Sequence, residues 1–232
     1  MAITATRLTR AAGVCAAVAG AIFIGVNINH PHMDVASITT TEVVIRNSLK
    51  VLMCALALAG IAGMYLSQVR RNGVLGLVGY LVLATGYLLI LSTTFVSAYV
   101  LPAIADTDPT YVEDVIAVAT GGSATGDIGA LGTINQVQGI AYLAGGLLFG
   151  IALYRARVLA RWAAVLLAVG GIVSAALAVM PDAFYRLLAY PNGIAMIGLG
   201  YSLWSTARGD VPTQPAEVDD RRATATAGEA TA

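Results

Sequence analysis

Long apolar runs constrain this chain more than any other feature of its sequence. A helix needs about 20 residues to cross the roughly 30 Å of hydrocarbon in a bilayer. Six runs reach about that length: 8–28, 45–67, 73–100, 132–154, 159–180 and 184–206. They lack the alternation of polar and apolar residues typical of outer-membrane strands, and backbone polar groups in lipid must be satisfied within the segment. The runs therefore predict an all-α, polytopic transmembrane bundle of six helices.

The overall composition agrees with a membrane environment. Hydrophobic residues make up 58% of the chain and charged residues 11%, whereas soluble domains carry about 25% charged residues; the mean hydropathy is +0.78. The formal net charge is zero and no tract is rich in Lys or Arg, so we expect the lipid bilayer, and no nucleic acid, as a partner. Cys15 and Cys54 lie inside apolar runs without a CxxC pair, which predicts packing residues.

The distribution of charge predicts the orientation, because Lys and Arg favour the cytoplasmic side. One set of connections carries Arg7, Arg10, Arg70, Arg71, Arg155, Arg157, Arg161 and Arg208. The opposite set carries Asp34, Glu42, Asp106, Asp108, Glu113, Asp114, Asp127 and Asp182 against Arg46, Lys50 and Arg186. We expect both termini in the cytoplasm. No small-x-small cleavage site follows the first run, so we expect it to be retained as a helix.

Two segments differ from the apolar runs. Residues 1–208 form the predicted transmembrane domain, and the polar, Pro/Thr/Ala-rich residues 209–232 predict a disordered cytoplasmic tail. In the third connection, Asp108 as N-cap, Pro109 as first residue and Gly121 as the stop predict a short outer surface helix near 109–120. The segment "GGSATGDIGALG" after it lacks the lysine of a phosphate-binding loop, and we interpret it as a flexible link.

Small residues one turn apart predict close helix packing within the bundle. Such pairs are Ala16 and Gly20, Ala59 and Gly63, Gly146 and Gly150, and Gly170 and Ser174, and a further row consists of Gly73, Gly76 and Gly79.

Uncharged polar residues collect near the predicted outer ends of the helices. They suggest a polar vestibule whose candidate ligand-binding residues are Thr94, Ser97, Asn135, Gln136, Gln138 and Asn192. Pro191 removes a backbone donor and is expected to kink the sixth helix about two turns inside its start. The alternative is that these side chains only join helices to one another or reach headgroups.

Charged residues open the second helix. Thr39 with Glu42 three residues later matches a capping box, and Glu42, Arg46 and Lys50 recur every four residues, which predicts one charged stripe with a Glu42–Arg46 pair. The long basic side chains can reach headgroups. Binding of an anion or a lipid headgroup by Arg46 and Lys50 is the alternative to a purely structural role.

The preceding loop, "NHPHMD", holds both histidines of the chain. His30, His32, Met33 and Asp34 offer nitrogen, sulfur and oxygen donors that copper accepts. Zinc requires a more complete ligand set, and both histidines lie in one loop, which does not suit a transmembrane haem. We expect no cofactor and a plain loop, with a weak copper site at His30 and His32 as the alternative.

Two classes of function remain open. The central part of each run lacks acidic residues, which argues against a proton-coupled pump, and no run contains a histidine that could serve a serine protease. We favour a non-enzymatic membrane protein that binds, senses or passes a small molecule or lipid. The alternative is an enzyme acting on a lipid or isoprenoid, with outer acids and histidines as acid–base groups; a pocket that raises the pKa of Asp34 or Glu42 would favour it. The sequence does not indicate an oligomeric state.

Four segments carry a resemblance to a known group of proteins: "RLTRAAG", "HPHMD", "LAGGLLFGIALYRARVLARWAA" and "YRLLAYPNGIAMIGLGYSLW". Over residues 7–206 the chain resembles small six-helix, multi-pass membrane proteins of high-GC Gram-positive bacteria. The resemblance implies a bacterial plasma membrane, and it offers no catalytic residue.

Overall fold

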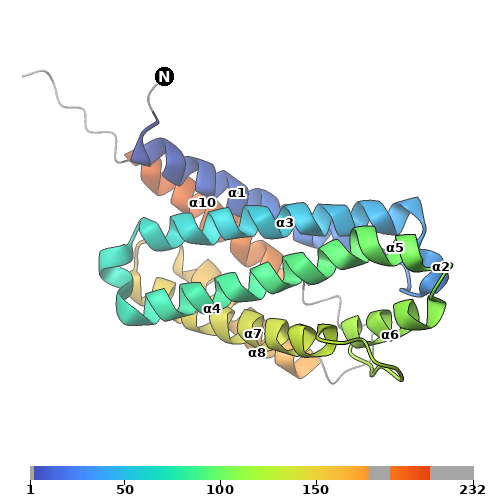
Figure 1. Ribbon diagram of the computed structural model, residues 1–232. Coiled ribbons are helices and arrows are strands. Elements are labelled where there is room, and N and C mark those ends of the chain that lie inside the picture. The colour runs from blue at the N-terminus through green and yellow to red at the C-terminus, as the bar shows by residue number, and fades with distance from the viewer. Residues whose placement is uncertain (1–2, 178–188, 210–232) are drawn as a thin grey trace, which may run out of the picture.

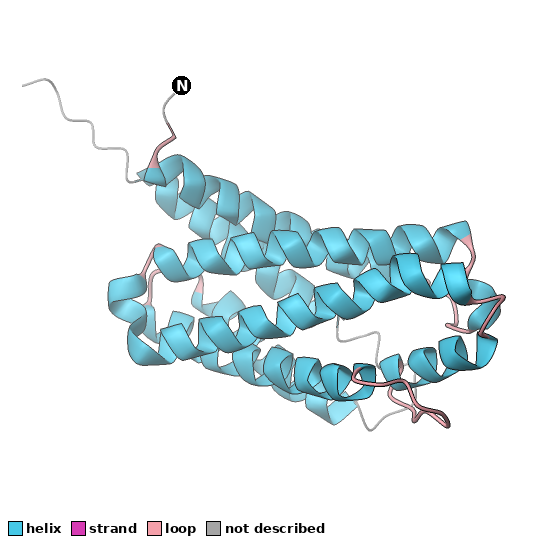
Figure 2. Cartoon of the chain, in the orientation of Figure 1, coloured by secondary structure: helices cyan, strands magenta, loops and turns pink. Residues whose placement is uncertain are grey.

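A computed structural model describes residues 3–177 and 189–209. All regular structure in these ranges is helical (Figure 2), as the apolar runs predict. In chain order the elements are α1 (Ala5–Asn27), α2 (Val35–Ile38), α3 (Thr41–Leu66), α4 (Val69–Phe95), the π-helix η1 (Val96–Val100), α5 (Leu101–Ile104), α6 (Pro109–Ala119), α7 (Leu131–Ala156), α8 (Arg161–Leu177) and α10 (Ala189–Gly209).

The six longest helices pack as a closed ring. Each packs mainly against two neighbours, in the order α1, α3, α4, α7, α8, α10 and back to α1. The start of α1, the α3–α4 and α7–α8 turns and the end of α10 gather at one end of the bundle (Figure 1). We call this the arginine end. The short helices α2, α5 and α6 lie at the opposite end, which we call the cap end.

Four helical segments of the described residues are long and apolar enough to cross a membrane. They are α1, α3, the stretch Val69–Ile104 that α4, η1 and α5 form together, and α7. Their bounds lie within a few residues of the first four predicted runs. The helices α8 and α10 fall where two more spans are predicted, but over the described residues α8 has 17 residues and α10 begins with the polar segment "YPN".

Glycines let neighbouring helices touch through their backbones. A Cβ atom added at Gly86 of α4 would stand 2.7 Å from the backbone nitrogen of Tyr142 on α7, and one added at Gly79 or Gly145 would come still closer to the facing helix. Gly20 meets Gly193 on α10, and Gly60 meets Ala16. Small residues therefore close the ring of helices, as the sequence predicts for packing within the bundle.

Gly73 departs from that prediction. It has φ 58° and ψ −159°, a conformation that breaks α4 near its start and is essentially restricted to glycine. Nothing lies within 4 Å of the position of a Cβ atom there. Of the predicted row, Gly73 allows a break in the helix, Gly76 faces the side chain of Asn72 in its own helix, and Gly79 packs against α7.

An apolar cluster separate from the core of the helix ring forms the cap end. Ile38 of α2 and Leu101 of α5 are fully buried against Val112 and Ile116 of α6. The predicted surface helix is confirmed, because Asp108 caps it by accepting from the Tyr111 N–H at 3.1 Å. Its end is also as predicted. Gly121 has φ 93° and donates to the Val118 carbonyl, while the Gly122 N–H donates to the Ala117 carbonyl at 2.8 Å.

Two local predictions are wrong. The segment after α6 is not a free link, because the Asp114 carboxylate accepts the N–H groups of Thr125 at 2.7 Å and Gly126 at 2.8 Å. Thr39 ends α2, so Thr40 caps α3 in its place. The kink expected at Pro191 stays a prediction, because Pro191 lies in α10 only three positions after residue 188, and residues 178–188 lie outside the described ranges. Asp182, Arg186 and the tail from residue 210 lie outside the described residues.

Candidate functional site

A groove lies between α1 and α3 at the cap end. It has a volume of about 500 Å³ and is lined by Ile22, Gly25, Val26, Glu42, Ile45, Arg46 and Leu49. Four of the lining side chains are aliphatic, and the charged pair Glu42 and Arg46 supplies the polar groups. Nothing lies within 4 Å of a Cβ atom added at Gly25, so the glycine leaves this part of the groove empty.

Arg46 joins the polar part of the groove to the end of α1. Its Nη1 donates to the backbone carbonyls of Val26 at 2.9 Å and Ile28 at 3.0 Å. Its Nε and Nη2 lie 3.0 and 2.9 Å from Glu42 Oε1, which confirms the predicted pair. The carbonyls at a helix end have no partner in the helix, and α1 has no basic residue in its own last turn. The guanidinium of α3 therefore caps the C-terminus of α1.

Lys50 lies one turn beyond Arg46 and contacts His30. The His30 Nδ1 is 2.9 Å from the Pro31 carbonyl oxygen, which can only accept, so Nδ1 carries the proton. Its Nε2 then has a lone pair, which accepts from the Lys50 ammonium at 3.0 Å. His30 is buried, and the Lys50 ammonium occupies the ring nitrogen that a metal ion would need.

The other proposed metal ligands are engaged differently. His32 is exposed. The Asp34 carboxylate accepts the Ser37 N–H and caps α2 in a capping box; these bonds, with a smaller effect of His32, lower the pKa of Asp34. Across residues 3–177 and 189–209, no three His, Cys, Asp or Glu side chains gather as a metal-binding group. The four donors of the loop thus do not converge on one point.

Amide and hydroxyl groups of the predicted vestibule form a chain between three helices. Asn135 of α7 donates through Nδ2 to the Val118 carbonyl of α6 at 2.9 Å, and Gln138 donates through Nε2 to Asn135 Oδ1 at 2.8 Å. The Thr93 hydroxyl of α4 donates to Gln138 Oε1, also at 2.8 Å. Because the Val118 carbonyl can only accept, it fixes the orientation of both amides. The chain links the cap helix α6 to the bundle.

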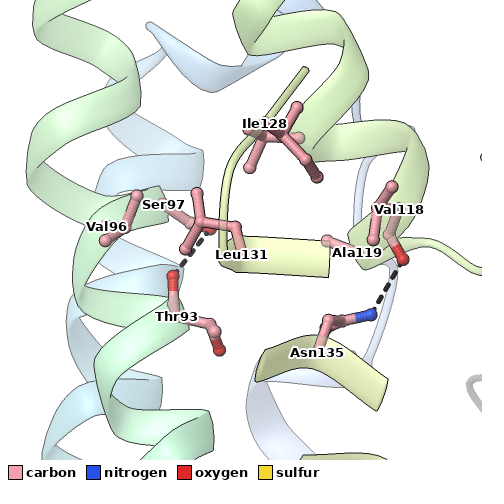
Figure 3. A pocket seen from close by; sticks show the side chains of 9 residues that line it. Thr93, Val96, Ser97, Val118, Ala119, Ile128, Leu131 and Asn135 are labelled. Carbon is pink, nitrogen blue, oxygen red and sulfur yellow. Dashed lines mark hydrogen bonds between the residues drawn. The ribbon is translucent and has the colours of Figure 1, made fainter. Parts of the chain in front are cut away.

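A small cavity adjoins this chain (Figure 3). Its volume is about 20 Å³ and its walls include Thr93, Ser97, Val115, Ile128 and Asn135, which is room for about one water molecule. Ser97 lies in the π-helix, and its hydroxyl donates to the Thr93 carbonyl at 3.1 Å. Small-molecule sites usually measure about 300 to 1,000 Å³, so the groove and not this cavity has the size of a ligand site.

The remaining candidate residues lie apart from one another. Thr94 is half-buried one position from Thr93 and outside the hydrogen-bonded chain, whereas Gln136 is exposed on α7. Asn192 is buried on α10 beside Gly170 of α8. Sequence reasoning missed Asn47, which is 2% exposed and donates to the Ser97 carbonyl at 3.4 Å. The sequence indicates Asn47 only as one more polar residue among Glu42, Arg46 and Lys50 at the start of α3.

Comparisons of the chain with known protein families, with curated proteins and with solved structures give no match. The functional argument therefore depends on the geometry of the groove and on the distribution of charge.

Proposed function

We propose that this protein is a membrane protein that binds a lipid in the groove between α1 and α3. The observation that supports this function is a groove of about 500 Å³ with aliphatic walls and the Glu42–Arg46 pair beside them. An amphiphile matches both parts, because its hydrocarbon chain can cover Ile22, Ile45 and Leu49 while its polar head meets the charged pair. Leu49 and Ile45 are exposed at 39% and 54%, so a hydrocarbon chain in the groove would shield them.

The position of the groove suits entry from the side. It lies between two helices that are apolar and long enough to cross a membrane. A lipid can therefore enter the groove sideways from the bilayer, and the water-sized cavity beneath α6 is not on its path. The bound headgroup would meet one remaining Nη2 proton of Arg46 and the second carboxylate oxygen of Glu42. This pair offers a donor beside an acceptor, which favours a headgroup that carries both kinds of group.

The proposal includes six membrane-spanning helices, with α8 and α10 as the fifth and sixth. Both termini and the arginine end face the cytoplasm of a bacterial cell, since the arginines in the described ranges other than Arg46 all fall at that end. Single cysteines in place of Asp34 and Gly122, in a background without Cys15 and Cys54, should react with an impermeant reagent added outside intact cells. A single cysteine in place of Arg71 should not react. Labelling of the Arg71→Cys variant from outside would contradict the orientation.

Filling the groove tests the proposed function directly. Gly25→Trp should fit the fold, because nothing lies within 4 Å of the added Cβ atom, and Gly139→Trp on α7 is a matched control with equal space outside the groove. In nanodiscs that contain a phospholipid with a photoreactive acyl chain, we expect cross-links to α1 and α3 around Ile45 and Leu49. Gly25→Trp should reduce them about tenfold while Gly139→Trp leaves them unchanged. Equal labelling of all three proteins would exclude a specific lipid site.

An enzyme that acts on a lipid or isoprenoid in the same groove is the alternative function. Such an enzyme needs a general acid or base near the bound head, and Glu42 is the carboxylate in that position. Its Oε1 is already held by Arg46, which fits a role in binding the head. Release of a cleaved or modified lipid during the nanodisc experiment, abolished by Glu42→Gln, would instead support the enzyme.

A further inference from the structure

The arginine end has an unusually uniform charge. Every acidic residue in the described ranges lies at the cap end or in the loops beside it. The arginine end carries Arg7, Arg10, Arg70, Arg71, Arg155, Arg157, Arg161 and Arg208. The densest part of this set is the connection between α7 and α8, where Arg155, Arg157 and Arg161 fall within seven residues. We call these three residues the arginine turn.

The arginine turn is held in place by neighbouring helices. The Ala160 N–H donates to the Ser202 hydroxyl of α10 at 2.9 Å, which fixes the connection against the bundle. The Arg161 guanidinium lies 4.1 Å from the centre of the Tyr154 ring. Stacking on an aromatic face leaves the N–H edge of a guanidinium available for an anion. All three arginines are exposed, so the held turn presents its positive charge outward.

Exposed aromatic residues lie on the helices that meet at the turn. Tyr154, Trp162 and Tyr201 are exposed at 38%, 58% and 65%, and Trp162 directly follows Arg161. Tyr and Trp concentrate where membrane hydrocarbon gives way to headgroups, because their rings are apolar and their N–H or O–H groups are polar. Aromatic residues of this kind are expected at the depth of lipid phosphates, and the arginine turn lies beside Tyr154 and Trp162.

We propose that the arginine turn binds the phosphate group of an anionic phospholipid. Three guanidinium groups match a phosphodiester whose lipid has a net negative charge, and the neighbouring aromatic rings contact the first methylene groups of its chains. A zwitterionic lipid brings a cation to the same place and loses most of this attraction. The site lies at the opposite end of the bundle from the groove between α1 and α3, and it does not depend on the function proposed for that groove.

The backbone of Arg157 provides a variant that separates binding from folding. Arg157 has φ 55° and ψ 30° at the end of α7, a left-handed conformation that glycine adopts without strain. Arg157→Gly should therefore leave the unfolding temperature unchanged or raised while it removes one charge. Arg157→Lys keeps the charge and serves as its matched control.

The test measures binding of short-chain phosphatidylglycerol and of phosphatidylcholine with the same chains, by native mass spectrometry of the full chain in detergent. We expect phosphatidylglycerol to bind at least about tenfold more tightly. Since a basic residue near a membrane surface contributes about 1 kcal/mol, Arg157→Gly should weaken that binding about fivefold and Arg157→Lys much less. A combined Arg155→Gln, Arg157→Gly and Arg161→Gln variant should lose the preference.

Four results would overturn the proposal. One is equal affinity for the two lipids, and another is a preference that survives in the triple variant. The third is displacement of bound phosphatidylglycerol by inorganic phosphate at an equal concentration, which would identify a site for a free anion. Gly25→Trp should leave the preference intact; if it removed the preference, the anionic lipid would belong to the groove. Failure of the groove proposal alone does not change the result expected here.

Discussion

The Nε2 atom of His30 accepts a hydrogen bond from the Lys50 ammonium across 3.0 Å. This contact joins the loop after α1 to the membrane helix α3, and it places a positive charge at the ring nitrogen that points into the protein. A cation such as copper would have to displace Lys50 to reach it. The neighbouring His32 is exposed, and Asp34 is engaged in capping α2.

We therefore predict that the purified protein carries no stoichiometric copper. Added copper should leave its unfolding temperature unchanged, and a variant with His30→Ala and His32→Ala should behave like the parent towards the metal. Elemental analysis of both proteins after purification without chelators measures this. About one copper per chain in the parent, absent from the double variant, would establish the metal site instead.

Arg46 should contribute more to stability than its partner Glu42. Arg46→Met leaves the carbonyls of Val26 and Ile28 without their donor, and hydrogen bonds from charged groups contribute about 1.5 to 3 kcal/mol each. The Arg46 side chain is only 19% exposed, so we expect a loss of about 2 kcal/mol. Glu42 is 59% exposed, and Glu42→Gln should cost less than about 1 kcal/mol. Denaturant unfolding in detergent measures both; equal losses would show that the ion pair, not the cap on α1, is what stabilises this region.

Local chemistry explains which features could be read from the sequence. The ends of α6 were predictable because Asp108 and Gly121 act on residues within one turn, and the Glu42–Arg46 pair was predictable because both lie on one helix face. The Thr39 cap was wrong because the four-residue helix α2 uses that threonine as its own end. Gly73 and Gly79 look alike in sequence, yet one breaks a helix and the other packs against α7.

The groove illustrates what sequence reasoning could not reach. Gly25 and Leu49 are far apart in the chain, and their proximity depends on how α1 crosses α3. The polar residues Gln138 and Asn135 were correctly expected near the same helix end. That they bond to each other, and that only a water-sized cavity remains beside them, follows from the position of α6, which no periodicity in the sequence specifies.

Gly86 should be among the positions least tolerant of substitution. Gly86→Ala would place a methyl group 2.7 Å from the Tyr142 nitrogen, which forces α4 and α7 apart, and overpacking of this kind typically costs about 1 to 3 kcal/mol. Gly139→Ala on α7 adds the same atom where nothing lies within 4 Å and should change stability by less than about 1 kcal/mol. Thermal unfolding of the two variants side by side gives the comparison. A tolerant Gly86 would mean that this contact between the helices is looser than described.

The Asp114 carboxylate should control the opening of the cap end. It accepts two backbone N–H groups, from Thr125 and Gly126, and these bonds lower its pKa. A carboxyl group with a lowered folded pKa stabilises the fold above its unfolded pKa and loses that effect as the pH falls through the folded value. Protection of the Thr125 and Gly126 amides from hydrogen exchange should thus persist at neutral pH and fall below about pH 4.

The Asp114→Asn variant presents an NH₂ group to one of the two donors, so the Thr125 and Gly126 amides should lose protection about tenfold already at pH 7. Glu113→Gln, on the exposed face of the same helix, is the matched control and should keep the protection of the parent. Equal loss in both variants would show that the charge of α6, and not the two bonds to Asp114, holds the segment in place.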